Sequence, residues 1–170
     1  MKAIRAASNG KISYCKFLSA NDTGETKSHQ AGIYIAKPAV PVIFNELGIR
    51  GSNKDRHVEI SWQEDFSTKS RFIYYGQGTR NEYRITQFGR GFPFLQPEHT
   101  GDLFVLVKQE EDQYSAYILS TEEEIEEFLA AFGMSPADTG AIIRKDSLTD
   151  KSQLDMSIDS FIHSLDVEFP

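Results

Sequence analysis

Apolar and polar residues alternate along most of this chain with the period of two that is typical of half-buried β-strands. The clearest case is Val58, Ile60 and Trp62, which alternate with Glu59 and Ser61. Further strands are predicted over residues 12–19, 32–36, 71–75, 85–88, 103–107 and 114–119. The stretch 103–107 is apolar at every position, so we expect that strand to be more deeply buried than the others.

Helices are few, and the sequence places most of them late in the chain. A brief helix is predicted over residues 39–47, before Gly48. Thr121 can cap a second helix that ends at Gly133, with Glu124 three residues on as its capping-box partner. The buried stripe of that helix is formed by Ile125, Phe128, Leu129 and Phe132. A third helix is predicted over 135–144, and residues 156–165 form either a last amphipathic helix or part of a tail.

Many short strands with a few helices predict a mainly β protein of the α+β class, built as a small barrel or sandwich. The chain has 170 residues, enough for one domain or for one domain with a tail. Its single cysteine, Cys15, excludes an internal disulfide and a cysteine-rich zinc site. The apolar stretches are too short to cross a bilayer, and the N-terminal residues have no hydrophobic signal run behind them. We therefore expect a soluble, intracellular protein without a membrane partner.

The charge of the chain is unevenly distributed along the sequence. The formal net charge is −7. Residues 1–100 hold 14 Lys and Arg against 9 Asp and Glu, a balance of +5, whereas residues 101–170 hold 4 against 16, a balance of −12. Such asymmetry allows the basic part to face a polyanion while the acidic part faces away or competes for the same surface. The plainer interpretation is that the acidic run 122–127 is the solvated face of a helix.

Catalytic chemistry is not indicated by the residues. Glu25-Thr26-Lys27 has the Glu-x-Lys form of a nuclease site, but no Asp or Glu precedes Asp22 to complete a magnesium site. Gly76-Gln77-Gly78 follows a predicted strand without a helix signal after it, unlike a phosphate-binding loop. Metal-ligand spacing is absent among the four histidines, His29, His57, His99 and His163. We predict no catalytic residue, no metal site and no cofactor for this chain alone.

The segment that follows Gly76-Gln77-Gly78 concentrates polar groups suited to reading DNA bases. Arg can donate two hydrogen bonds to guanine, Asn can pair with adenine, and Glu can accept from cytosine N4. All three residue types lie between Thr79 and Arg84, as Arg80, Asn81, Glu82 and Arg84. The alternating Arg and Glu are also compatible with a salt-linked hairpin end, and the residues alone leave both interpretations open.

Several blocks of sequence together resemble a known family. One group comprises residues 18–24 and 29–35; the other comprises residues 73–75, 79–86, 89–91 and 97–101. In order, content and approximate spacing they resemble the N-terminal effector domain of EcoRII-type restriction endonucleases. The resemblance runs from about Tyr14 to Val107. The closing Val167-Glu168-Phe169-Pro170 resembles the family's exit from the domain into a linker.

The resemblance implies a B3-like DNA-binding pseudobarrel of about seven short strands, in which two arms grip the major groove. It implies double-stranded DNA as partner and CC(A/T)GG, or a related short site, as target. Residues 1–145 would be the DNA-binding domain, and 146–170 a linker or C-terminal helix leading to a PD-(D/E)XK nuclease domain elsewhere. Magnesium would be needed only by that covalently linked nuclease domain. The isolated recognition domain would be monomeric and act in the bacterial cytoplasm.

Carried over by position, the family's first arm corresponds to residues 27–30 and its second arm to 79–84. The residues expected to read bases are His29, Gln30, Arg80, Asn81, Glu82 and Arg84. The residues expected to contact the DNA backbone are Ser19, Asn21, Thr23, Lys27, Ser28, Thr79, Tyr83 and Arg90. Lys16, Lys69 and Arg71 are weaker phosphate candidates.

This chain departs from the family in its second arm. The family's arm is longer and carries lysines where this chain has Gly78 and Tyr83, so we expect weaker phosphate contacts and a smaller salt dependence. Tyr83 either packs on a sugar or thymine methyl or points into the core beside Ile85. The alternative function is a protein-interaction module that binds no DNA, with the helix after Thr121 and the aromatic strands as its surface.

Overall fold

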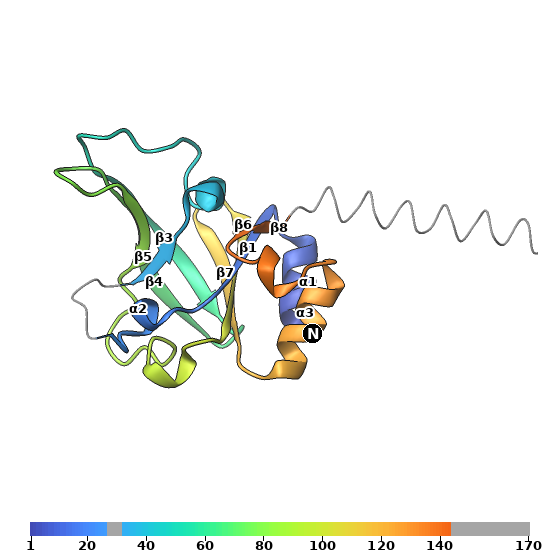
Figure 1. Cartoon of the computed structure of the whole chain (residues 1–170). Coiled ribbons are helices and arrows are strands. Elements are labelled where there is room, and N and C mark those ends of the chain that lie inside the picture. Colours follow the sequence, from blue (N-terminus) through green and yellow to red (C-terminus); the bar gives the residue numbers. More distant parts are fainter. Residues whose placement is uncertain (27–31, 144–170) are drawn as a thin grey trace, which may run out of the picture.

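A computed structural model describes residues 1–26 and 32–143 of the chain. Within this part, eight strands form one curled sheet in the order β2-β5-β4-β3-β7-β6-β1-β8 (Figure 1). Strands β3 and β7 run parallel, and the other neighbours are antiparallel. The strands are β1 (Ile12–Phe17), β2 (Ile33–Ile35), β3 (Lys54–Trp62), β4 (Phe66–Tyr75), β5 (Glu82–Thr86), β6 (Leu103–Glu110), β7 (Gln113–Leu119) and β8 (Ala141–Ile143). The helices are α1 (Lys2–Asn9), α2 (Ala20–Thr23), α3 (Glu122–Ala131) and the 3-10 helices η1 (Lys37–Val42), η2 (Pro97–His99) and η3 (Pro136–Asp138).

The inner face of the curled sheet encloses the larger of two hydrophobic cores. Trp62 is fully buried there, with its ring 4.7 Å from that of Phe92 and 5.9 Å from that of Phe104. The Trp62 indole donates a hydrogen bond of 2.8 Å to Thr68 Oγ1, so its polar atom is satisfied inside the core. Helix η1 contacts β1, β5 and β8 and adds Val40 to the same core.

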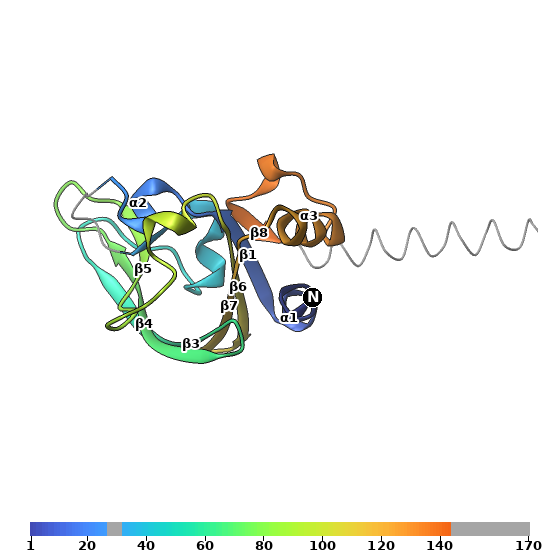
Figure 2. The ribbon, with the colours of Figure 1, turned by 90° about the horizontal axis from the view of Figure 1, so that it is seen from below.

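The second core lies on the outer face of β1, β6 and β7, beneath α1 and α3. Helix α3 begins as predicted, because the Thr121 hydroxyl accepts a hydrogen bond of 3.1 Å from the Glu124 amide. It buries Phe128 and Leu129. Because side chains pack on both faces of β6, that strand is apolar at each of its first five positions. Helices α1 and α3 lie on the side of the molecule opposite to α2 (Figures 1 and 2).

The predicted fold class is confirmed, with eight strands in place of about seven. Helix α1 was not predicted, and the helix expected over 39–47 is the earlier 3-10 helix η1. The helix expected over 135–144 is wrong. Gly140, at φ 83°, breaks the segment, and its amide donates to the Cys15 carbonyl at 2.8 Å. The residues after it therefore pair with β1 as β8. The expected segment 146–170 lies outside the described residues.

Candidate nucleic-acid interface

Two candidate arms flank a short two-stranded ladder at one side of the molecule. Strand β2 pairs antiparallel with β5, so Tyr34 lies opposite Arg84. The β4–β5 loop (residues 76–81) leads into one end of this ladder, and α2 lies towards the other. Both project away from α1 and α3 (Figures 1 and 2). The ladder therefore lies between α2 and the β4–β5 loop, the described parts next to the two predicted arms.

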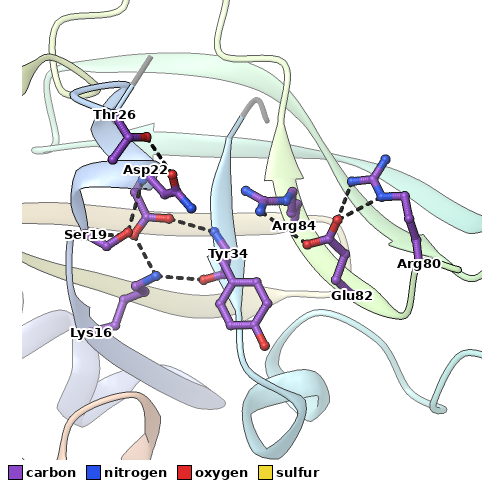
Figure 3. Close-up of polar contacts among 9 residues, drawn as sticks. Lys16, Ser19, Asp22, Thr26, Tyr34, Arg80, Glu82 and Arg84 are labelled. Atoms are coloured by element: carbon purple, nitrogen blue, oxygen red, sulfur yellow. Dashed lines mark hydrogen bonds and ion pairs between the residues drawn. The ribbon is translucent and has the colours of Figure 1, made fainter. Parts of the chain in front are cut away.

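The base of the first arm is held by the buried carboxylate of Asp22, whose side chain is 0% exposed. One oxygen accepts from the Ser19 amide at 2.9 Å and pairs with the Lys16 ammonium at 2.6 Å. The other oxygen accepts from the Tyr34 amide at 2.9 Å. The Lys16 ammonium also donates to the Tyr34 carbonyl at 2.9 Å (Figure 3). Because β2 is an edge strand, Asp22 and Lys16 satisfy backbone groups that no further strand reaches.

Three predicted backbone-contact residues lie at this base, and they differ in exposure. Ser19 is exposed, and its hydroxyl accepts from the Asp22 amide at 3.1 Å. Asn21 is exposed, and its side-chain oxygen accepts from the Thr26 hydroxyl at 2.6 Å. Thr23 is 3% exposed, with its hydroxyl bonded to that of Thr100 at 2.6 Å. The Thr23 side chain packs inward and holds α2 against η2, and its predicted contact with the DNA backbone stays a prediction.

Lys27, Ser28, His29 and Gln30, the predicted tip of the first arm, lie outside the described residues. Lys16, a weaker phosphate candidate, is instead committed to Asp22 and Tyr34.

The second arm carries a cluster of Arg80, Glu82 and Arg84, here called the arginine–glutamate cluster. Strand β5 begins at Glu82, three residues earlier than predicted, so Glu82 and Arg84 share one of its faces, where Glu82 is half-buried and Arg84 is buried. One Glu82 oxygen accepts from Arg80 Nε at 2.8 Å and also from Arg80 Nη2. The other oxygen accepts from Arg84 Nη2 at 3.2 Å (Figure 3). The salt links between Arg and Glu side chains that the sequence allows in this segment are therefore present in the structure.

The cluster is further ordered by aromatic rings. The Arg80 guanidinium lies 3.6 Å from the centroid of the Tyr75 ring, a cation–π contact. The Arg84 guanidinium lies 5.9 Å from the centroid of Tyr34, which is 42% exposed. Neither tyrosine was predicted to belong to the site. The alternation of Ile33, Tyr34 and Ile35 was the signal that places Tyr34 on the outer face.

The two arginines keep Glu82 ionised. Partial burial by itself would raise the pKa of Glu82, but hydrogen bonds and positive charge from Arg80 and Arg84 outweigh it and hold the pKa below its usual value. A carboxylate has about four lone-pair positions, so it can accept further hydrogen bonds while it holds both arginines. The Arg80 side chain is 44% exposed and has five N–H donors, more than its bonds to Glu82 use. The Arg84 side chain is 3% exposed, so it lies beneath Glu82.

The remaining residues predicted to contact DNA from the second arm differ in how exposed they are. Thr79 and Asn81 are exposed, and the Asn81 side-chain oxygen accepts from the Tyr74 hydroxyl at 2.7 Å. Tyr83 is 5% exposed, and its hydroxyl accepts from the Gly48 amide at 2.7 Å. Of the two positions left open for Tyr83, the structure has the inward one, because alternation along β5 turns its ring into the core beside Ile85. Its predicted contact with the DNA backbone stays untested.

Arg90 is exposed on the loop that follows β5, between Gly89 and Gly91, whose φ angles are 81° and 77°. Together with Lys69 and three phenylalanines it lines a hollow of about 580 Å³. Arg90 is thus outside the arginine–glutamate cluster, and its predicted contact with phosphate stays a prediction.

Within residues 1–26 and 32–143, no three His, Cys, Asp or Glu side chains gather as metal ligands would. The helices of that same part are all too short or too polar to cross a membrane. The thiol of Cys15 is buried, and burial raises its pKa to about 12.

Comparison with known proteins places these features in a family. The model of the family "Restriction endonuclease EcoRII, N-terminal" matches residues 7–143. The type II restriction enzyme EcoRII of Escherichia coli is 35% identical over 107 residues, which make up 59% of this chain and 26% of that enzyme. The matched region thus spans about a quarter of the enzyme's length.

A solved structure of the B3 domain of the UbaLAI restriction endonuclease with cognate DNA has the same fold. Its TM-score is 0.50 at 20% identity, covering 84% of this chain and 92% of that one. At this identity the similarity shows a B3-like pseudobarrel and no more. The family model, in contrast, covers most of the chain, including α2, the β2–β5 ladder and the arginine–glutamate cluster. The chain therefore belongs to the family of EcoRII N-terminal domains of restriction endonucleases.

Proposed function

We propose that this chain is the sequence-specific double-stranded DNA recognition domain of a type II restriction endonuclease. The observation that carries the proposal is the arginine–glutamate cluster, which lies where the β4–β5 loop enters the β2–β5 ladder. Membership of the EcoRII family supports it, as does the solved complex of the UbaLAI B3 domain with cognate DNA. The acidic helix α3 lies on the opposite side, so its charges do not line the proposed DNA surface.

The cluster suits base pairs of guanine and cytosine in the major groove. Arg80, which is 44% exposed, can donate to guanine O6 and N7, and Glu82 can accept from cytosine N4. Arg84, which is 3% exposed, would read a guanine after turning outward from its bond to Glu82. Each well-formed bidentate contact adds about 1–3 kcal/mol of discrimination. These preferences fit CC(A/T)GG or a related short site, in which four of the five base pairs are C·G. Because Glu82 and Tyr75 already orient Arg80, little ordering of that side chain is left for the binding step.

The other contacts follow from exposure and family position. His29 and Gln30 would read bases from the first arm, and Asn81 from the second. Contacts to the DNA backbone would come from exposed groups of both arms and the loop after β5. These backbone candidates are Ser19, Asn21, Lys27, Ser28, Thr79 and Arg90.

The chain itself carries out no catalysis under this proposal. Residues 1–145 form the recognition domain, and 146–170 connect it to a nuclease domain that binds magnesium and cuts DNA in the bacterial cytoplasm. Alone, the recognition domain is monomeric.

Fluorescence-anisotropy titration with labelled duplexes tests the proposal. We expect a Kd between about 10⁻⁸ and 10⁻¹¹ M for a CC(A/T)GG duplex, and much weaker binding to a scrambled one. Arg80→Ala should weaken cognate binding about 10- to 100-fold with little change on scrambled DNA. Arg5→Ala, an exposed arginine on α1, is the matched control. Equal losses on both duplexes would exclude base reading by Arg80, and no binding at low salt would favour the protein-interaction alternative.

A further inference from the structure

A second loop, comprising residues 45–53 between η1 and β3, lies against the β4–β5 loop along its outer side (Figure 1). The Gly51 amide donates to the Gly76 carbonyl at 2.7 Å. The Asn53 side-chain oxygen accepts from the amides of Gly76 and Gln77 at 2.8 and 3.1 Å. These three hydrogen bonds connect the 45–53 loop to the start of the β4–β5 loop.

Aromatic residues of the second arm reinforce this connection. Gly48 packs so closely on the Tyr74 ring that an added Cβ would lie 2.2 Å from it, and a Cβ on Gly76 would lie 2.4 Å from the same ring. The Tyr83 hydroxyl accepts from the Gly48 amide at 2.7 Å, and the Tyr74 hydroxyl donates to Asn81 at 2.7 Å. The ring that positions the base-reading loop therefore also holds the 45–53 loop, and the two loops form one structural unit.

The outer loop presents side chains that the fold does not use. Ile49 is 78% exposed and Leu47 is 52% exposed, the two highest values among the large hydrophobic residues of the described part. A lone exposed apolar residue needs no explanation, but here two lie within three residues on a braced loop. The exposed Arg50 follows directly and donates to the Gly78 carbonyl at 3.3 Å. At the start of the same loop, the Lys54 ammonium donates a hydrogen bond to the backbone carbonyl of Glu46.

We infer that the 45–53 loop is the outer half of the second arm and contacts the same DNA duplex as the arginine–glutamate cluster. This inference rests on the proposed function. Arg50 reaches a phosphate, which a guanidinium can bind while it keeps its bond to Gly78, because Arg has five N–H donors. Ile49 and Leu47 lie against deoxyribose. The loop is on the side of the β4–β5 loop away from α2, so these contacts fall on base pairs that flank those next to the arginine–glutamate cluster.

The test compares Arg50→Ala and Ile49→Ser with the control Arg5→Ala on two duplexes. The long duplex extends beyond the recognition site on both sides, and the short duplex ends at the site. On the long duplex, Arg50→Ala should weaken binding about 3- to 10-fold for cognate and scrambled sequences alike, and reduce the salt slope by about 0.9. Ile49→Ser should weaken binding about fivefold, within the range for loss of one apolar contact. Both losses should disappear on the short duplex.

The outcomes separate this inference from the proposed function. If the unsubstituted chain binds neither duplex, both fall together. If it binds with specificity that depends on Arg80, but Arg50→Ala and Ile49→Ser match Arg5→Ala, the inference is overturned and the proposed function stands. Losses that persist on the short duplex would also overturn it, because the contacts would then not lie on flanking DNA. Circular dichroism of each variant confirms that these exposed positions leave the fold unchanged.

Discussion

Replacing Asp22 with Asn tests the structural basis of the first arm. The Asp22 carboxylate joins three elements, because it pairs with Lys16 of β1, caps α2 through Ser19 and bonds the Tyr34 amide of β2. Asparagine has nearly the same shape but has no charge. One of its two side-chain polar atoms is an NH₂ group, which can accept no hydrogen bond from an amide or an ammonium.

The expected loss is large because the ion pair is shielded from solvent. The side chains of Asp22 and Lys16 are 0% and 12% exposed. Removing one partner of such a pair leaves the other charge uncompensated, which typically destabilises a protein by about 3–5 kcal/mol. At an m-value of about 2 kcal/mol/M, the urea midpoint should fall by roughly 2 M.

The chain provides its own control for this experiment. Ser135 and Asp138 form a second capping box of the same Ser-x-x-Asp form, with the Ser135 amide 2.8 Å from the Asp138 carboxylate. That carboxylate is exposed and has no lysine partner in the described structure. Asp138→Asn should therefore shift the urea midpoint much less than Asp22→Asn.

Lys16→Met adds a second control, because it leaves the Asp22 carboxylate with two backbone amides as donors. The double variant should lose less stability than the two single losses added together. Midpoints of Asp22→Asn and Asp138→Asn that agree within error would refute the reasoning, since burial of the ion pair would then contribute nothing.

Three further predictions concern single residues. Tyr83→Phe leaves the Gly48 amide without its acceptor and should lower the free energy of unfolding by about 1–2 kcal/mol in urea titration; an unchanged value would contradict the bond. Cys15 should react slowly with a thiol reagent at pH 8 until denaturant is added, because burial raises its pKa to about 12; rapid labelling of the folded chain would argue against burial. The folded-state pKa of Glu82 is lowered, so its stabilising contribution is complete above the unfolded-state pKa and is lost as pH falls through the folded-state value. The stability difference between the unsubstituted chain and Glu82→Gln should therefore shrink below about pH 4, and a constant difference would contradict the lowered pKa.

The parts of the fold that were predictable are those that depend on local alternation. Val58, Ile60 and Trp62 alternate because one face of β3 is buried, and that burial is visible in the sequence. Strand β8 was missed because three residues after Gly140 carry too little periodicity, and their pairing with β1 is a contact over more than 120 residues. Long-range packing decided that segment against its local pattern.

In the candidate site, too, the features set by local alternation were predictable, and those set by long-range packing were not. The position of Glu82 and Arg84 on one face of β5 follows from alternation, once the strand is known to begin at Glu82, but the burial of Arg84 does not. The burial of Asp22 does not follow from its sequence, because Asn21-Asp22-Thr23-Gly24 is ordinary turn chemistry. Only the approach of β1 and β2 places Lys16 and the Tyr34 backbone around that carboxylate.

A net charge of −7 is compatible with the proposed DNA recognition because of where the charges lie. At physiological ionic strength, exposed charges more than about 8 Å apart are largely screened from one another. The exposed carboxylates of α3 lie behind β1, β6 and β7, on the side away from the arms. A duplex at the β4–β5 loop would meet the exposed Arg80 at close range, while the acidic side would be repelled and so favour the productive orientation of approach. The total charge of the chain is thus a poor guide to its partner, and the charge within a screening length of the arms is the relevant quantity.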